Sequence, residues 1–225
     1  MIKKFAAVAG ASLLALTAQA GVVTQSFTVP SHITELVPTV DFGTFDMFDS
    51  TLGTLTGATL MLNGQAIFAF NATNTSLQAQ RANLTSATDL FFSSDLAALD
   101  ALLNSITIGM SYSTGLLSYA AGETKSFGPV TDSDNFAPDL SSILGSLTGT
   151  GTYKVMCETI SSFTVGGGGG NIGTQQQTQA GCGATLTYTY NDAPPPNNVP
   201  EPASLALMGA ALVGLGAARR RRNAA

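Results

Sequence analysis

Short runs in which hydrophobic and polar residues alternate fill most of the chain, at 58–62, 65–70, 153–165 and 174–190 among others. Residues typical of turns separate these runs, and Thr, Ser, Gly and β-branched residues dominate them. Alternation with a period of two is typical of strands that bury one face. The pattern predicts an all-β protein, an antiparallel β-sandwich of jelly-roll or immunoglobulin-like type with one or two short helices.

The Asn63-Gly64 pair lies between two apolar runs, 58–62 and 65–70. Asn-Gly is the strongest short signal for a two-residue hairpin, because both turn residues need positive φ. The pair therefore predicts a hairpin in which Leu60 faces Ile67. Apolar side chains occur on both of its faces, so we expect it to be central or covered.

Two short helical segments are expected between the strands. Ser94 is a suitable N-cap for a helix over 95–104, in which three leucines recur at three- and four-residue steps. A proline and a glycine bound a second candidate helical turn, over 139–145.

The N-terminal 20 residues follow a different pattern. Lys3 and Lys4 precede an apolar stretch, which ends at the small-residue sequence Ala18-Gln19-Ala20. This order is typical of a secretory signal peptide, so residues 1–20 are predicted to be a signal helix that is cut before Gly21.

The C-terminus combines prolines, an apolar segment and arginines. A Pro-rich linker over 193–199 leads to the sequence Val199-Pro200-Glu201-Pro202, and small apolar residues fill 203–218. A helix over 203–218 rises about 24 Å, short of a hydrocarbon core of about 30 Å. The basic cluster Arg219, Arg220, Arg221 and Arg222 follows it. The order predicts a short transmembrane helix over 203–218 with an Arg-rich cytoplasmic tail, within a signal over 200–225.

Residues 21–192 remain as one predicted domain. It holds three basic residues, Arg81, Lys125 and Lys154, against thirteen acids, a net charge of −10. Such a charge repels phosphate backbones, so a nucleic-acid partner is not expected.

Cys157 and Cys182 are the two cysteines of the chain, and in an exported protein they predict one disulfide. If 153–165 and 174–190 paired as a hairpin with Val165 opposite Thr174, the two cysteines would stand directly opposite each other. The spacing of directly opposed residues suits a disulfide, so this register is the expected one.

No catalytic site and no cofactor are expected. His32 is the single histidine, so neither a hydrolytic triad with a neighbouring base nor a four-ligand Cys/His zinc site is indicated. Gly168, Gly170 and Gly173 match G-x-G-x-x-G, but no strand-helix pattern surrounds them, and they are interpreted as a loop.

Three acids form a candidate calcium site. Asp132, Asp134 and Asp139 fall within eight residues and offer oxygen ligands. The cluster lacks the glycine and the distal glutamate of an EF-hand loop, and the alternative interpretation is a set of solvated turn residues.

The order of Val199-Pro200-Glu201-Pro202, an apolar helix and an arginine cluster resembles the PEP-CTERM sorting signal of exported proteins in Gram-negative bacteria that make an exopolysaccharide matrix. This resemblance implies recognition by exosortase, a membrane-embedded transpeptidase that removes the tail near Pro200 to Pro202. It also implies an intermediate anchored transiently in the inner membrane, and then a place on the cell surface or in the extracellular matrix.

Short segments of the domain resemble the choice-of-anchor E family, whose activity is unassigned. They include Gln25-Ser26-Phe27, Phe48-Asp49, 148–152 and 184–190. Two functions are therefore expected as alternatives. The first is a non-catalytic surface or matrix protein processed by exosortase, and the second is a carbohydrate- or calcium-binding module of the exopolysaccharide layer.

Overall fold

The computed structural model describes residues 20–34, 41–193, 208–213 and 219. The chain divides into two units, Met1–Asp192 and Ala193–Ala225. The predicted signal peptide, apart from Ala20, lies outside the described residues, as does the linker after Ala193.

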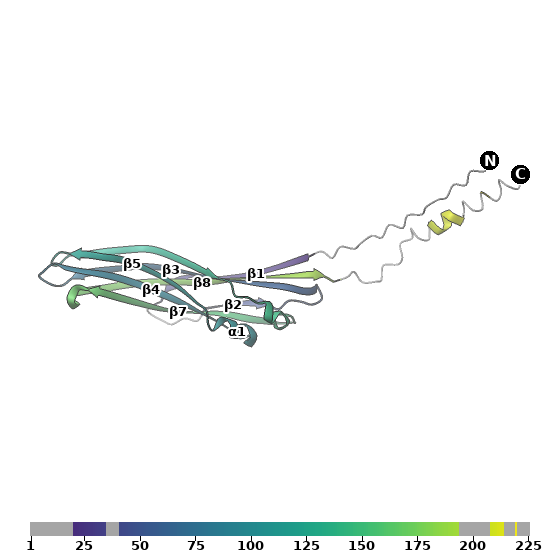
Figure 1. Ribbon diagram of the computed structural model, residues 1–225, viewed down its shortest axis with the longest axis horizontal. Helices are drawn as coiled ribbons and strands as arrows, with labels where there is room; N and C mark the ends of the chain where they lie inside the picture. Colours follow the sequence, from purple (N-terminus) through teal and green to yellow (C-terminus); the bar gives the residue numbers. More distant parts are fainter. Residues whose placement is uncertain (1–19, 35–40, 194–207, 214–218, 220–225) are drawn as a thin grey trace, which may run out of the picture. The chain divides into compact units, whose positions relative to one another are not determined.

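Eight strands form two four-stranded antiparallel sheets, which confirms the predicted β architecture (Figure 1). The first sheet has the order β1-β8-β3-β6 and the second the order β2-β7-β4-β5. The strands are β1 (Ala20–Ile33), β2 (Asp41–Asp46), β3 (Gly53–Asn74), β4 (Gln80–Ser94), β5 (Thr107–Tyr119), β6 (Thr124–Phe136), β7 (Thr152–Gly167) and β8 (Ile172–Asp192).

The core lies between the sheets and follows from the alternation along the strands. In β3, the even-numbered residues from Leu60 to Phe70 are buried, while the odd-numbered ones are exposed or half-buried. In β8, the even-numbered residues from Thr178 to Tyr188 are likewise buried. The two strands pair from Gly53 opposite Asp192 to Asn74 opposite Ile172. From Ala58 onward in β3, residues at even positions of both strands therefore share the inner face.

The hairpin predicted at Asn63-Gly64 is wrong, because both residues lie within the single strand β3. Gly64 pairs with Cys182 of β8 on one side and with Asp134 of β6 on the other, and its φ is not positive. A Cβ atom on Gly64 would overlap the Leu90 side chain and lie 3.1 Å from Cγ2 of Ile108. The glycine is needed for the close approach of the second sheet, and the long ladder overrides the local turn preference.

The predicted disulfide between Cys157 and Cys182 is confirmed, with Cα atoms 6.7 Å apart. The expected hairpin register is wrong, because Cys157 lies in β7 of one sheet and Cys182 in β8 of the other. The disulfide therefore joins the two sheets across the core. The chain crosses between them through Gly167 to Gly170, all with positive φ that suits glycine.

The first predicted helix is present as α1 (Ala97–Leu103), at one end of the sandwich in Figure 1, with Leu99 and Leu103 buried. Ser94 does not cap it in the expected way. Its hydroxyl accepts a hydrogen bond from the Leu96 N–H and donates one to the Lys154 carbonyl. The second segment is a 3₁₀ helix, η1 (Ser141–Leu147), which begins two residues later than expected. A further 3₁₀ turn, η2 (Gly168–Gly170), precedes β8.

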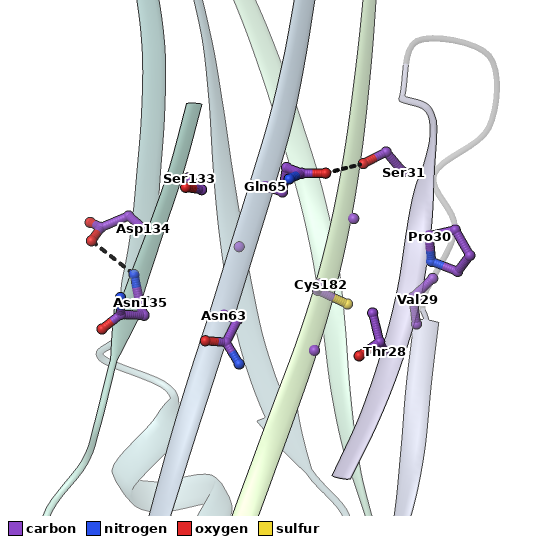
Figure 2. A pocket seen from close by; sticks show the side chains of 13 residues that line it. Thr28, Val29, Pro30, Ser31, Asn63, Gln65, Ser133, Asp134, Asn135 and Cys182 are labelled. Carbon is purple, nitrogen blue, oxygen red and sulfur yellow. Dashed lines mark hydrogen bonds between the residues drawn. The ribbon is translucent and has the colours of Figure 1, made fainter. Parts of the chain in front are cut away.

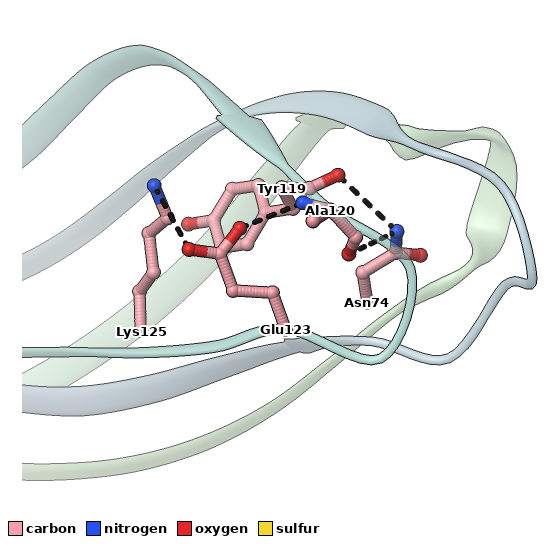
Figure 3. Close-up of polar contacts among 5 residues, drawn as sticks. All are labelled: Asn74, Tyr119, Ala120, Glu123 and Lys125. Atoms are coloured by element: carbon pink, nitrogen blue, oxygen red, sulfur yellow. Dashed lines mark hydrogen bonds and ion pairs between the residues drawn. The ribbon is translucent and has the colours of Figure 1, made fainter.

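A buried amide holds the turn between β5 and β6 (Figure 3). The Asn74 side chain is fully buried, and its amide nitrogen donates to the carbonyls of Gln78 and Ala120, at 2.8 and 2.9 Å. The Ala120 N–H donates to the Glu123 carboxylate at 2.6 Å, and Lys125 lies 3.5 Å from the same carboxylate. The end of β3 is thus fixed to the neighbouring turn by satisfied polar groups.

Replacing Gly64 with Ala is expected to lower the free energy of unfolding by about 1–3 kcal/mol, the usual range for overpacking a core. The loss should shrink in a Leu90→Val background, because the overlap is with that side chain. Urea denaturation of the four proteins in the double-mutant cycle measures both values. Gly145→Ala is the control, since nothing lies within 4 Å of its added Cβ. An equal loss in both Leu90 backgrounds would contradict the packing explanation.

Replacing both cysteines with Ala is expected to cost about 3 kcal/mol of stability, the chain-entropy value for a closed loop of this length. A reductant should lower the urea midpoint of the unaltered protein to that of the double variant and leave the variant unchanged. A midpoint that does not respond to reductant would show that the link contributes nothing to stability.

Candidate functional site

The C-terminal unit is described in part. Residues 208–213 and Arg219 are helical, and they are exposed. The sorting sequence from Val199 to Pro202, the remainder of the helix predicted over 203–218, and Arg220 to Arg222 lie outside the described residues. A search of the described segments found no helix with the length and apolarity needed to cross a membrane.

The three candidate calcium ligands bind backbone N–H groups. Asp132 and Asp134 lie on β6, and Asp139 precedes η1. Asp134 accepts from its own neighbour, the Asn135 N–H, at 2.8 Å. Asp139 accepts from the Ser141 N–H at 2.9 Å, and this hydrogen bond lowers the pKa of its carboxyl. In the part of the chain that is described, no three His, Cys, Asp or Glu residues are grouped so as to hold a metal ion.

Asp132 links the edges of the two sheets. It pairs with Ala66 and therefore points to the inner face of β6, the edge strand of the first sheet. Its carboxylate accepts the Ser111 N–H of β5, the edge strand of the second sheet, at 3.0 Å. An inward-pointing charge on an edge strand discourages pairing with another chain. We interpret Asp132 as a structural and protective residue of this edge.

Two buried tyrosines, one from each sheet, form a hydrogen-bonded pair. The hydroxyls of Tyr153 and Tyr188 lie 3.2 Å apart, and Tyr188 also donates to the Asp46 carbonyl at 3.1 Å. Burial raises the pKa of both phenols, so both stay protonated at neutral pH. His32 lies elsewhere, with Nδ1 3.3 Å from the Pro30 carbonyl oxygen. The tyrosine pair therefore belongs to the core.

A groove of about 400 Å³ lies on the outer face of the first sheet (Figure 2). Its floor is the β8 backbone at Gly181 and Gly183, and β1 bulges between Val29 and His32 to form one wall. A Cβ atom on Gly181 would lie 2.7 Å from the Val29 carbonyl oxygen, so the bulge requires a glycine beneath it. Polar side chains line the groove, from Thr28, Ser31, Asn63, Gln65, Ser133 and Asn135.

The groove is not predicted by the sequence pattern. Its walls come from β1, β3 and β6, which are distant in sequence and come together only in the folded sheet. One local signal was available, since Gly181 and Gly183 alternate within a strand pattern. Glycine inside a strand is typical of a bulge or of close backbone approach.

Comparison with protein families identifies the C-terminal signal. The model of the PEP-CTERM protein-sorting motif matches residues 198–222, so the chain carries this motif. The match confirms the predicted class of sorting signal. A search of curated proteins found no match to the chain.

Solved structures resemble the chain only weakly. A desmodium yellow mottle tymovirus structure aligns over 87% of this chain and 96% of its own, at 11% identity and a TM-score of 0.27. The infectious bursal disease virus VP2 subviral particle aligns over 79% of this chain and 38% of its own, at 12% identity and a TM-score of 0.21. Similarity at this level carries no argument about function.

Replacing Asp132 with Ala is expected to cost about 1 kcal/mol of stability, because the Ser111 N–H loses its acceptor. Asp134→Ala is the matched control on the same strand, since its carboxylate bonds only the adjacent Asn135 N–H and should change stability by less than about 0.5 kcal/mol. Urea denaturation measures both. Equal losses would mean that the contact between the sheet edges is not what stabilises this region.

Proposed function

We propose that this is an exported, non-catalytic protein of the cell surface or extracellular matrix, and that exosortase recognises and removes its tail. The PEP-CTERM motif at residues 198–222 is the observation that carries this proposal. A protein with this motif is exported, processed at the membrane and brought to the cell surface. In this proposal, a signal peptide over 1–20 exports the chain, and a short helix over 203–218 brings its tail to exosortase in the membrane.

The physical chemistry of the tail supports cutting near Pro200 to Pro202. The two prolines lack backbone N–H donors and bias their neighbours away from helical φ and ψ, so the sequence predicts an extended segment before the apolar stretch. A peptidase needs such an extended segment. The arginine cluster, of which Arg219 is described, holds the other end of the helix on the cytoplasmic side.

The disulfide supports export as well. A buried covalent link between Cys157 and Cys182 suits an oxidising compartment, because cytosolic proteins keep their thiols reduced. Removal of the signal peptide before Gly21 would take away one paired residue of β1, Ala20, and leave its ladder with β8 from Gly21 to Val29 and at His32 and Ile33.

The strand order supports the jelly-roll type over the immunoglobulin-like type. Consecutive strands lie in alternate sheets except β4 and β5, whereas an immunoglobulin-like sandwich begins with two neighbouring strands in one sheet. We also infer that the domain belongs to the choice-of-anchor E type on the basis of its sequence segments, one of which lies on β1 and another on β8.

Mass spectrometry of the mature protein tests the processing step. In cells with active exosortase we expect a C-terminus between Pro200 and Pro202, with the arginines absent. The triple variant Pro200→Ala, Glu201→Ala and Pro202→Ala should keep its full tail, and a variant with Pro194→Ala alone is the control that should still be cut. An intact arginine tail on the unaltered protein in those cells would refute the proposal.

A further inference from the structure

The outer face of the first sheet consists of uncharged residues. From Gly57 onward in β3, and throughout β8, the strand registers place odd-numbered residues on this face, together with even-numbered residues of β1 before its bulge. None of these positions in the described strands carries an ionisable side chain, and most carry a hydroxyl or an amide. The domain nevertheless has thirteen acids. The described acids are therefore absent from these outward-facing positions of β1, β3 and β8.

The opposite surface shows that this distribution is not a general property of the fold. On the outer face of the second sheet, Arg81 and Asp89 of β4 and Lys154 and Glu158 of β7 are exposed. Both sheets are antiparallel, and both bury their inner faces. Exposed charges are sufficient to keep the outer face of a sheet soluble, as on the second sheet. The lack of charges on the first sheet is therefore not explained by solubility.

The uncharged face is also hollowed along its length. Besides the groove over Gly181 and Gly183, two further hollows of about 370 and 350 Å³ share Asn71 and Gln175. From Asn63 to Thr73 along β3, the face extends for about 33 Å at the usual strand rise. This length suits an extended chain better than a compact small molecule.

Several amides on the face have unused hydrogen-bonding capacity. In the described structure the side-chain amides of Asn63, Asn135 and Gln175 make no hydrogen bond to other protein groups. Gln65 accepts one from Ser31 through its oxygen at 3.3 Å, which leaves its nitrogen available (Figure 2). Each amide offers both a donor and an acceptor, which matches sugar hydroxyl groups that also do both.

The rim of the groove carries one acid, Asp134. Its carboxylate turns toward the Asn135 N–H and away from Asn63 (Figure 2). Cations are absent from the described groove lining. An anionic ligand would thus meet no compensating charge and would be repelled by the acidic domain. A neutral ligand would have no such electrostatic cost of binding.

We propose that the outer face of the β1-β8-β3-β6 sheet binds a neutral polysaccharide chain, seated on the glycine floor and held by amide and hydroxyl groups of β3 and β6. This binding extends the proposed surface or matrix function but does not depend on tail processing. Binding is measured on purified protein, so its failure is distinguishable from a failure of sorting. Hydrogen bonds between uncharged groups carry the interaction, so affinity should change little between low and high salt.

Affinity electrophoresis tests the proposal on the full-length protein in a polyoxyethylene detergent, which has no sugar headgroup. The gels contain dextran, galactomannan or hydroxyethylcellulose as neutral probes, or alginate as the charged one. We expect at least one neutral probe to retard the protein and alginate to leave it unretarded. The Asn63→Ala/Gln65→Ala variant should bind about tenfold more weakly, as expected for the loss of two neutral hydrogen-bonding groups.

The control variant is Ser162→Ala/Thr164→Ala, which removes two exposed hydroxyls from the second sheet and should leave the retardation unchanged. Equal melting temperatures of the two variants establish that both fold. Retardation by alginate alone, or an equal loss in both variants, would overturn the proposal. Absence of retardation by every neutral probe would overturn it too. The proposal would also be overturned if analytical sedimentation showed that the protein is a dimer and that only the Asn63→Ala/Gln65→Ala variant is a monomer. In that case a second copy of the chain would cover the face.

Discussion

The pairing of β3 with β8 is the constraint on which the rest of the domain depends. These two central strands run antiparallel for their full length, and Gly64 stands opposite Cys182 near the middle. Because side chains alternate with a period of two, this single register sends one set of residues into the core and the other to the outer surface. A slip of one residue would bury Asn63 and Gln65 and expose Leu62 and Ala66. The disulfide from Cys182 to Cys157 opposes such a slip, because it fixes β8 to the facing sheet.

The sequence pattern was sufficient for the class of fold and insufficient for the pairing of strands. Alternation predicted the antiparallel sandwich because burial of one face acts locally on each strand. The local pattern was misleading at Asn63-Gly64, where the turn preference of two residues is outweighed by the ladders on both sides of β3. It also failed for the cysteine strands, because a matching register cannot show that two segments belong to the same sheet. The groove remained hidden for a related reason, since its walls meet only after β1, β3 and β6 are assembled.

The tail and the domain contribute different parts of the proposed function. The tail carries a sorting motif, and its prolines and arginines can be recognised in the sequence because they follow one another along the chain. The domain contributes a surface, and surfaces depend on tertiary structure. Its two outer faces differ in charge although both are solvated. The uncharged face is therefore the one proposed to bind a neutral ligand. Asp132 accepts a hydrogen bond from Ser111 and so joins the edges of the two sheets, and Asn74 donates one to Ala120 and so fixes the end of β3. These contacts keep the sheet in one arrangement.

The register of β3 against β8 is tested most directly by nuclear magnetic resonance on isotopically labelled protein. Cross-strand nuclear Overhauser effects should connect residues 62 and 184, 64 and 182, and 66 and 180, as one uninterrupted series on both sides of Gly64. This series would establish together the continuous strand, the buried set and the uncharged outer face. Contacts between Leu62 and Gln65 across a tight turn at Asn63-Gly64, with the series broken there, would contradict the account.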